Sequence, residues 1–111
     1  SNDASADLLF PPDLLQRFED KKVESVFKIP KGEKGIGWFC VVEWIKKTTK
    51  NKKVFYRVKI TDDHSNTGWL RVWGEIPEDM QPYTIWLTET KNDPNWGCAT
   101  SSRKVRPLVV A

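Results

Sequence analysis

The clearest pattern along the chain is an alternation of apolar and polar residues within positions 36 to 74. Val54–Thr61 and Trp69–Trp73 both alternate, and a period of two is typical of β-strands whose side chains point to opposite faces of a sheet. An apolar run rich in β-branched and aromatic residues, Ile36–Lys47, precedes them, and the polar segment Thr48–Lys53 provides a turn. The pattern predicts three consecutive antiparallel strands, with a hairpin between the first two.

The two faces of these predicted strands differ in chemistry. One face is an apolar core made of Val54, Tyr56, Val58, Ile60, Leu70 and Val72. The opposite face is aromatic and basic, and it carries Phe55, Arg57, Lys59, Thr61, Trp69, Arg71 and Trp73. Folding alone does not require aromatic rings between cations on a water-facing surface, so this face is a candidate binding surface.

Two more strands are predicted after a loop or single helical turn over Gly74–Pro82, namely Tyr83–Lys91 and Trp96–Arg106. Five strands, with a long bent first strand and a break between the third and fourth, follow the order of an OB-fold Greek-key barrel. A small β-sandwich and an SH3-like barrel are the alternatives within the all-β class. Inside the barrel we expect Val41, Val58, Ile60, Leu70, Val72, Ile85 and Leu87.

The segment before the barrel is predicted to be an arm with a short helix. The prolines that follow Phe10 are a helix-start signal, and Asp13–Asp20 then places apolar residues on one side of a helix. Val23–Ile29 is either a short strand or an extended arm. The glycine-containing loop Lys31–Gly35 marks the boundary, which gives an N-terminal arm over 1–35 and an OB-fold barrel over 36–111.

Composition adds a local basic patch to this picture. The 111 residues suit one domain, and the net charge of +3 is mild. Between Glu43 and Lys59, however, there are seven Lys or Arg residues and one acid. Five of these cations line the predicted hairpin: Lys46, Lys47, Lys50, Lys52 and Lys53. Solubility alone is the alternative explanation for such lysines.

Several classes of function are disfavoured. Cys40 and Cys98 form no Cys-x-x-Cys pair and there is one histidine, so we expect no zinc and no other cofactor. Two buried free thiols in a cytoplasmic protein are expected, with a disulfide as the alternative. No apolar run approaches the ~20 residues that span a membrane, and no signal peptide is recognised, so we expect no membrane partner. The opening Ser-Asn suggests an expression scar on an excised domain.

A catalytic role for this domain is also disfavoured. Asp62, Asp63 and His64 adjoin, but a metal-assisted hydrolase or polymerase needs carboxylates that converge from separate elements. Adjacent aspartates at the end of a strand are more often turn caps. The chain has no Gly-rich phosphate loop, Gly-x-Ser-x-Gly or His-Glu-x-x-His motif. We therefore expect the domain itself not to be an enzyme.

The run VVEWIKKTTKNKKVFYRVKITDDHSNTGWLRVWG resembles the OB-fold segment of bacterial replicative DNA polymerases of the polymerase III alpha-subunit type. Thr49-Lys50-Asn51-Lys52 matches that family's hairpin, Ile60-Thr61-Asp62 its Leu-x-Asp, Gly68 its glycine, and Arg103–Leu108 its last strand. The chain differs at Asn51, where the family has glycine, and at Trp69 and Trp73.

This resemblance covers residues 36–108. Anticodon-binding OB domains of aminoacyl-tRNA synthetases and other single-strand-binding modules share the pattern. The resemblance to the polymerase III alpha type implies that the domain comes from a bacterial or phage replication protein. The full-length parent would be a DNA-directed DNA polymerase, and its other domains would be partners of this one.

The predicted function is therefore binding of single-stranded nucleic acid, with DNA favoured over RNA. Such proteins stack bases on aromatic rings and follow the phosphates with cations. The predicted site consists of Phe55, Arg57, Lys59, Trp69, Arg71, Trp73, Lys46, Lys47, Lys50, Lys52 and Lys53. Two alternatives remain: the tryptophans pack against Leu14, Leu15 and Phe18 of the helix, or the domain is a protein-interaction OB module in a replication or tRNA-related assembly.

Overall fold

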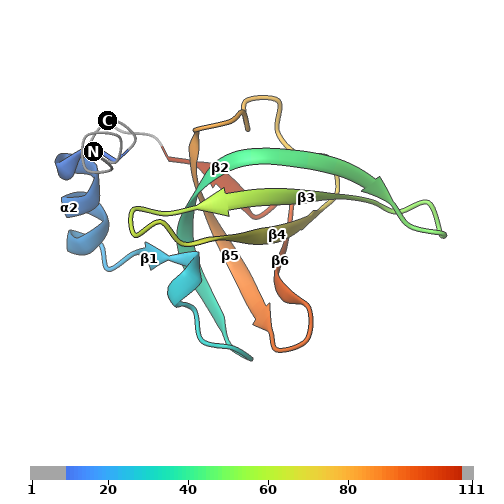
Figure 1. Cartoon of the computed structure of the whole chain (residues 1–111), viewed down its shortest axis with the longest axis horizontal. Helices are drawn as coiled ribbons and strands as arrows, with labels where there is room; N and C mark the ends of the chain where they lie inside the picture. Colours follow the sequence, from blue (N-terminus) through green and yellow to red (C-terminus); the bar gives the residue numbers. More distant parts are fainter. Residues whose placement is uncertain (1–9, 109–111) are drawn as a thin grey trace.

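The computed structural model describes residues 10–108, which form one α-helix, one 3-10 helix and seven strands (Figure 1). The arm holds α2 (Pro12–Asp20), β1 (Glu24–Ser25) and η1 (Val26–Lys28). The remaining strands are β2 (Lys34–Thr48), β3 (Val54–Thr61), β4 (Thr67–Trp73), β5 (Ile85–Asp93), β6 (Gly97–Ser101) and β7 (Val105–Pro107). The predicted helix and first four strands are present, with ends that differ by at most two residues.

Five strands close into a barrel. β2 pairs antiparallel with both β3 and β5, β3 pairs antiparallel with β4, β4 runs parallel to β6, and β6 pairs antiparallel with β5. This circle, β2-β3-β4-β6-β5, is the strand order of an OB-fold barrel, so the predicted fold class is confirmed. β1 and β7 are two additional short strands, which pair with β2 and β5.

The length and bend of β2 allow it to join both sides of the barrel. Its first half, Lys34–Cys40, pairs with β5, and its second half pairs with β3. A bulge lies between Val41 and Glu43, where the register with β3 shifts by one residue. Such an extra residue bends a strand and increases its twist, which a small closed barrel requires. The bulge also changes which residues of β2 face inward on either side of it.

The core is largely the expected one. Val41, Val58, Ile60, Leu70 and Val72 are all buried, together with Phe39, Met80 and Trp86. The prediction was wrong for Ile85 and Leu87, which face outward and pack with the helix cluster. The inward apolar residue of β5 is Trp86, whose indole N–H donates to Thr84 Oγ1 at 2.7 Å.

The predicted fifth strand, Trp96–Arg106, is also divided in the structure. Residues between β6 and β7 form a turn, in which the Lys104 amide donates to the Ser101 carbonyl at 2.9 Å. This turn lets the chain leave β4 and return to β5, where Val105 lies opposite Thr88. The three residues of β7 therefore pair with β5 instead of extending β6.

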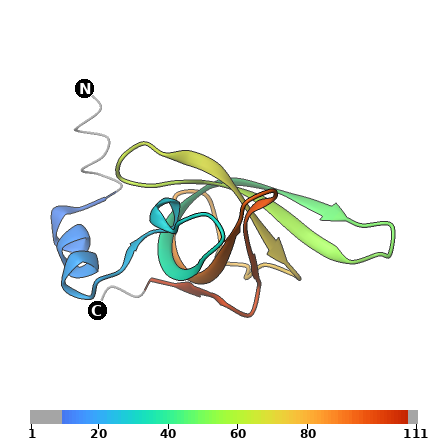
Figure 2. The same cartoon turned by 90° about the horizontal axis from the view of Figure 1, so that it is seen from below.

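Helix α2 packs on the outside of the barrel over Trp38. The Phe18 ring stacks on the Trp38 indole with centroids 4.8 Å apart and planes 7° apart, and Phe10 contacts the same indole at 5.5 Å. Leu14 and Cys40 complete this buried cluster. Two views show α2 at one end of the long axis and the tip of the β2–β3 hairpin at the other (Figure 1, Figure 2).

Candidate nucleic-acid interface

The outer face of β3 and β4 brings six of the predicted site residues together. Each residue lies opposite another across the antiparallel ladder, as the register shows: Phe55 with Trp73, Arg57 with Arg71, and Lys59 with Trp69. Trp69 is 39% exposed and the other five are partly buried. The strand alternation predicted this face correctly, because β3 and β4 are regular and Tyr56, Val58, Ile60, Leu70 and Val72 of their inner face are buried.

The aromatic rings of this face are held by their neighbours. The Arg57 guanidinium lies 4.4 Å from the centroid of the Trp69 indole, which is a cation–π distance. At the other end of the ladder, the Phe55 and Trp73 rings lie 4.8 Å apart at an angle of 38°. The rings are therefore positioned before any ligand arrives, which lowers the entropy that a stacking partner must overcome.

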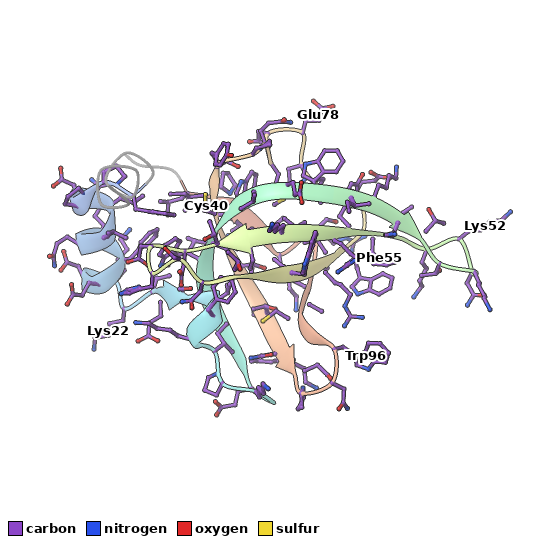
Figure 3. The ribbon with its side chains drawn as sticks, viewed as in Figure 1. Lys22, Cys40, Lys52, Phe55, Glu78 and Trp96 are labelled. Carbon is purple, nitrogen blue, oxygen red and sulfur yellow. The ribbon has the colours of Figure 1, made fainter. Side chains whose placement is uncertain are left out.

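A further exposed tryptophan, Trp96, extends the face, and sequence reasoning did not include it in the site. It is 73% exposed on the turn between β5 and β6, and Arg71 lies 5.7 Å from its ring centroid (Figure 3). The Asp93 carboxylate fixes this turn by accepting from the Asn95 and Trp96 amides at 2.8 and 3.0 Å. These two bonds lower the pKa of Asp93, in that order of effect.

Arg71 sits at the centre of this group with spare hydrogen-bonding capacity. It lies opposite Arg57 on β3 and contacts Trp96, and its Nε atom is buried with no hydrogen-bond partner among residues 10–108. A buried donor without an acceptor is unfavourable, and an anionic oxygen that reached it would relieve this cost. Arg71 is therefore the strongest candidate on the face for contact with a phosphate.

The hairpin supplies a second group of cations. Lys47 lies opposite Phe55 and so belongs to the same face, while Lys50, Lys52 and Lys53 are exposed at the tip (Figure 3). The turn is closed by the Thr49 hydroxyl, which accepts from the Lys53 amide at 3.1 Å. Lys52 has a φ of 62°, the left-handed conformation that glycine adopts most easily.

Lys46 does not lie with the other predicted residues. It stands opposite Tyr56, whose side chain belongs to the inward-facing set, and its ammonium pairs with the Glu75 carboxylate at 2.8 Å. Glu75 also accepts from the Tyr56 hydroxyl at 2.5 Å, and the bonds from Lys46 and Tyr56 lower the pKa of Glu75. The charge of Lys46 is thus matched on the other side of the hairpin, so we remove it from the candidate site.

The contacts of α2 do not support the alternative in which the tryptophans of this face pack against the helix. The buried residues of the helix, Leu14 and Phe18, cluster with Trp38 and Cys40. Neither Trp69 nor Trp73 belongs to that cluster, and Trp69 retains its exposure with the helix in place. Within residues 10–108, the aromatic and basic face is therefore open to a ligand.

Asp62, which the sequence made a candidate for a catalytic or metal-binding role, caps a turn. Its carboxylate accepts from the Ser25 hydroxyl at 2.7 Å, the Asn66 side-chain amide at 2.9 Å, and the backbone amides of His64 and Asn66 at 2.9 and 3.0 Å. Burial raises the pKa of Asp62, but these four hydrogen bonds outweigh it and the pKa is lowered. Asp62, Asp63 and His64 lie close enough to approach one ion, yet Asp62 has already used its acceptors.

Both cysteines are free. Cys40 is buried under α2, and Cys98 is partly buried beside the barrel core. Burial raises the pKa of the Cys40 thiol to about 11, so it remains protonated and unreactive at neutral pH. The expectation of two unpaired thiols is confirmed, although Cys98 is less buried than expected.

Comparison with known proteins adds no assignment. No family model, no curated protein and no solved structure matches this chain. Among residues 10–108, no helix has the length and apolar character needed to cross a membrane.

Proposed function

We propose that this domain binds single-stranded DNA on the outer face of β3 and β4. The observation that carries the proposal is the alternation of partly exposed rings with guanidinium groups on one open face. Trp69, Trp73 and Trp96 supply the rings, and Arg57 and Arg71 lie between them. Single strands are bound in this way, by stacking bases on aromatics at ~1–3 kcal/mol per base while cations follow the phosphates.

The geometry favours a single strand over a duplex. Trp69 and Trp73 are four residues apart on β4, which places them ~13 Å apart along the strand and suits two separate bases. A duplex hides the faces of its bases, so exposed rings of this kind find no partner there. The lysines of the hairpin then extend the electrostatic surface beyond the stacking residues.

The parent protein is the second part of the proposal. The resemblance of residues 36–108 to the polymerase III alpha type supports an excised module of a bacterial or phage replicative polymerase in the cytoplasm. In such a parent the module would bind single-stranded DNA and contact the other domains, while catalysis would belong elsewhere in the chain. DNA is therefore favoured over RNA as the ligand.

One alternative has an observation in its favour. Ile45 lies opposite Arg57 and is 44% exposed, so an apolar side chain continues the aromatic face onto β2. Exposed aromatic and aliphatic residues together are typical of the centre of a protein interface. A protein-interaction module of a replication or tRNA-related assembly would use the same face.

Titration of the tryptophan fluorescence with oligo(dT) and oligo(rU), at two salt concentrations, separates these functions. Single-strand binding predicts quenching that saturates and an affinity that falls steeply with salt. Tighter binding of oligo(rU) would replace DNA by RNA as the ligand. Absence of quenching with either oligonucleotide at low salt would contradict the proposal and favour the protein-interaction module.

A further inference from the structure

The aromatic face continues into a groove that runs around the barrel away from β3. Its first part, with a volume of about 290 Å³, begins at Trp73 and crosses β6 towards β5 and the start of β2. Its second part, of about 310 Å³, shares Glu89 and Lys104 with the first and ends at Arg106 on β7. Together they form a path from the last stacking residue of β4 to the far side of the barrel.

The groove is open above β6 because the outward-facing residues of this strand are small. Ala99 lies beside Arg71 and Ser101 beside Trp73 in the parallel pair of β4 and β6, so both small side chains share the outward face. Their inward neighbour Thr100 is buried, and its hydroxyl lies 2.8 Å from that of Thr88. Small residues between a tryptophan wall and a lysine wall leave room for a chain to pass over β6.

The far wall is strongly basic. Five exposed cations line the two parts of the groove: Lys34, Lys91, Arg103, Lys104 and Arg106. Among the residues that line it, Glu89 is the one acid, and its carboxylate lies 3.6 Å from the Lys104 ammonium. An excess of four positive charges along the groove favours an extended polyanion over a basic or neutral partner that packs equally well.

We propose that a bound single strand leaves the stacking face at Trp73 and continues over β6 along this groove, with its phosphates towards Lys91, Lys104 and Arg106. This inference rests on the proposed function and adds a path and a length to it. The stacking face holds the first few nucleotides, and the groove binds the following ones mainly through charge. Affinity should therefore keep rising with oligonucleotide length after the tryptophans are occupied.

The test is the binding of labelled oligo(dT) of about 4, 8, 12 and 16 nucleotides, the range of site sizes among OB folds. The groove variant carries Lys91→Gln, Lys104→Gln and Arg106→Gln. The control variant loses the same charge in the N-terminal arm, at residues that do not line the groove, through Lys21→Gln, Lys22→Gln and Lys28→Gln. We expect the groove variant to lose roughly tenfold or more in affinity for the longest oligonucleotide, and its salt slope to fall by ~2, near 0.7 per phosphate contact.

The shortest oligonucleotide should bind the groove variant and the natural chain within about twofold, and the control variant should bind all lengths like the natural chain. If the natural chain binds the shortest and longest oligonucleotides equally, or both variants lose affinity equally, the groove is not part of the path. That result would leave the proposed binding on the outer face of β3 and β4 unaffected. Absence of binding at every length would overturn the proposed function itself. A Ser101→Glu variant, which puts an acid on the groove floor, should reproduce the length-dependent loss if the triple variant folds poorly.

Discussion

Replacement of Trp69 by alanine separates a stacking role from a structural one. The ring lies on the outer face of β4, 39% exposed, with the Arg57 guanidinium 4.4 Å from its centroid. Truncation leaves a space open to water instead of a closed cavity. The stability cost is therefore limited to lost surface contact and the cation–π term of ~0.5–1 kcal/mol, and we expect about 1–2 kcal/mol in total. Loss of a stacked base should cost ~1–3 kcal/mol of binding free energy, a five- to 150-fold rise in Kd.

Trp44 provides a matched control for this change. Its side chain is 40% exposed, nearly the same as that of Trp69. Trp44 pairs with Val58, however, and therefore shares the inward-facing side of the sheet instead of the aromatic and basic face. Its indole N–H donates to the Met80 carbonyl at 3.3 Å. Trp44→Ala should therefore cost at least as much stability as Trp69→Ala and leave the affinity unchanged. Trp38→Ala, in the buried cluster under α2, should cost ~3–5 kcal/mol of stability.

Anisotropy of labelled oligo(dT) gives the Kd without depending on the tryptophans, and urea unfolding gives the stability of the same samples. The stacking role requires a weaker affinity for Trp69→Ala alone among the three. The reasoning is refuted if Trp69→Ala binds like the natural chain and loses as much stability as Trp38→Ala. The outer face of β4 would then be a structural seam.

Three further predictions concern other parts of the molecule. Lys50→Ala, Lys52→Ala and Lys53→Ala together should flatten the salt slope of single-strand binding by ~2 and change stability by ~0.5 kcal/mol or less; unchanged affinity would remove the hairpin from the site. Trp96→Ala should weaken binding by ~1–3 kcal/mol with little change in Tm, because the side chain is 73% exposed; a Tm loss as large as that of Trp38→Ala would contradict this. Asp62→Ala leaves the Ser25 hydroxyl and two backbone amides without their acceptor, and should cost ~2–4 kcal/mol at pH 7. Because the folded-state pKa of Asp62 is lowered, its carboxylate stabilises the fold above the unfolded-state pKa of about 3.9 and loses that effect as pH falls; urea unfolding between about pH 7 and 3 should show the difference between the two proteins shrinking with acidity.

The sequence predicted β3 and β4 well for a physical reason. Their inner residues are buried in the barrel and their outer residues are not, so a period of two separates the faces completely. β5 lacks this contrast. Ile85 and Leu87 pack with the helix cluster outside while Trp86 fills the core inside, so apolar residues occupy both sides and the period cannot show which is inward.

Two details of the site escaped sequence reasoning for similar local causes. Lys46 and Lys47 follow each other on β2, so they point to opposite faces. The register beyond the bulge between Val41 and Glu43 places Lys47 with Phe55, and Lys46 with Tyr56 and Glu75. Trp96 sits on a turn, where alternation carries no information about facing, and its place beside Arg71 depends on how β6 pairs with β4. The sequence did contain one signal for Trp96: it directly follows the turn residues Asp93 and Asn95, and an aromatic residue at a turn is often exposed.

The salt dependence of oligo(dT) binding tests the central claim most directly. With about six phosphate contacts from Arg57, Arg71, Lys47 and the three lysines of the hairpin tip, the affinity should fall about 300-fold between about 50 and 200 mM salt, a slope near −4. Arg71→Ala should bind more weakly and flatten this slope by ~0.7, because it removes one proposed phosphate contact at a side chain whose buried Nε has no hydrogen-bond partner among residues 10–108. An affinity for oligo(dT) that is absent, or that does not change over this range of salt, would contradict single-strand binding on this face.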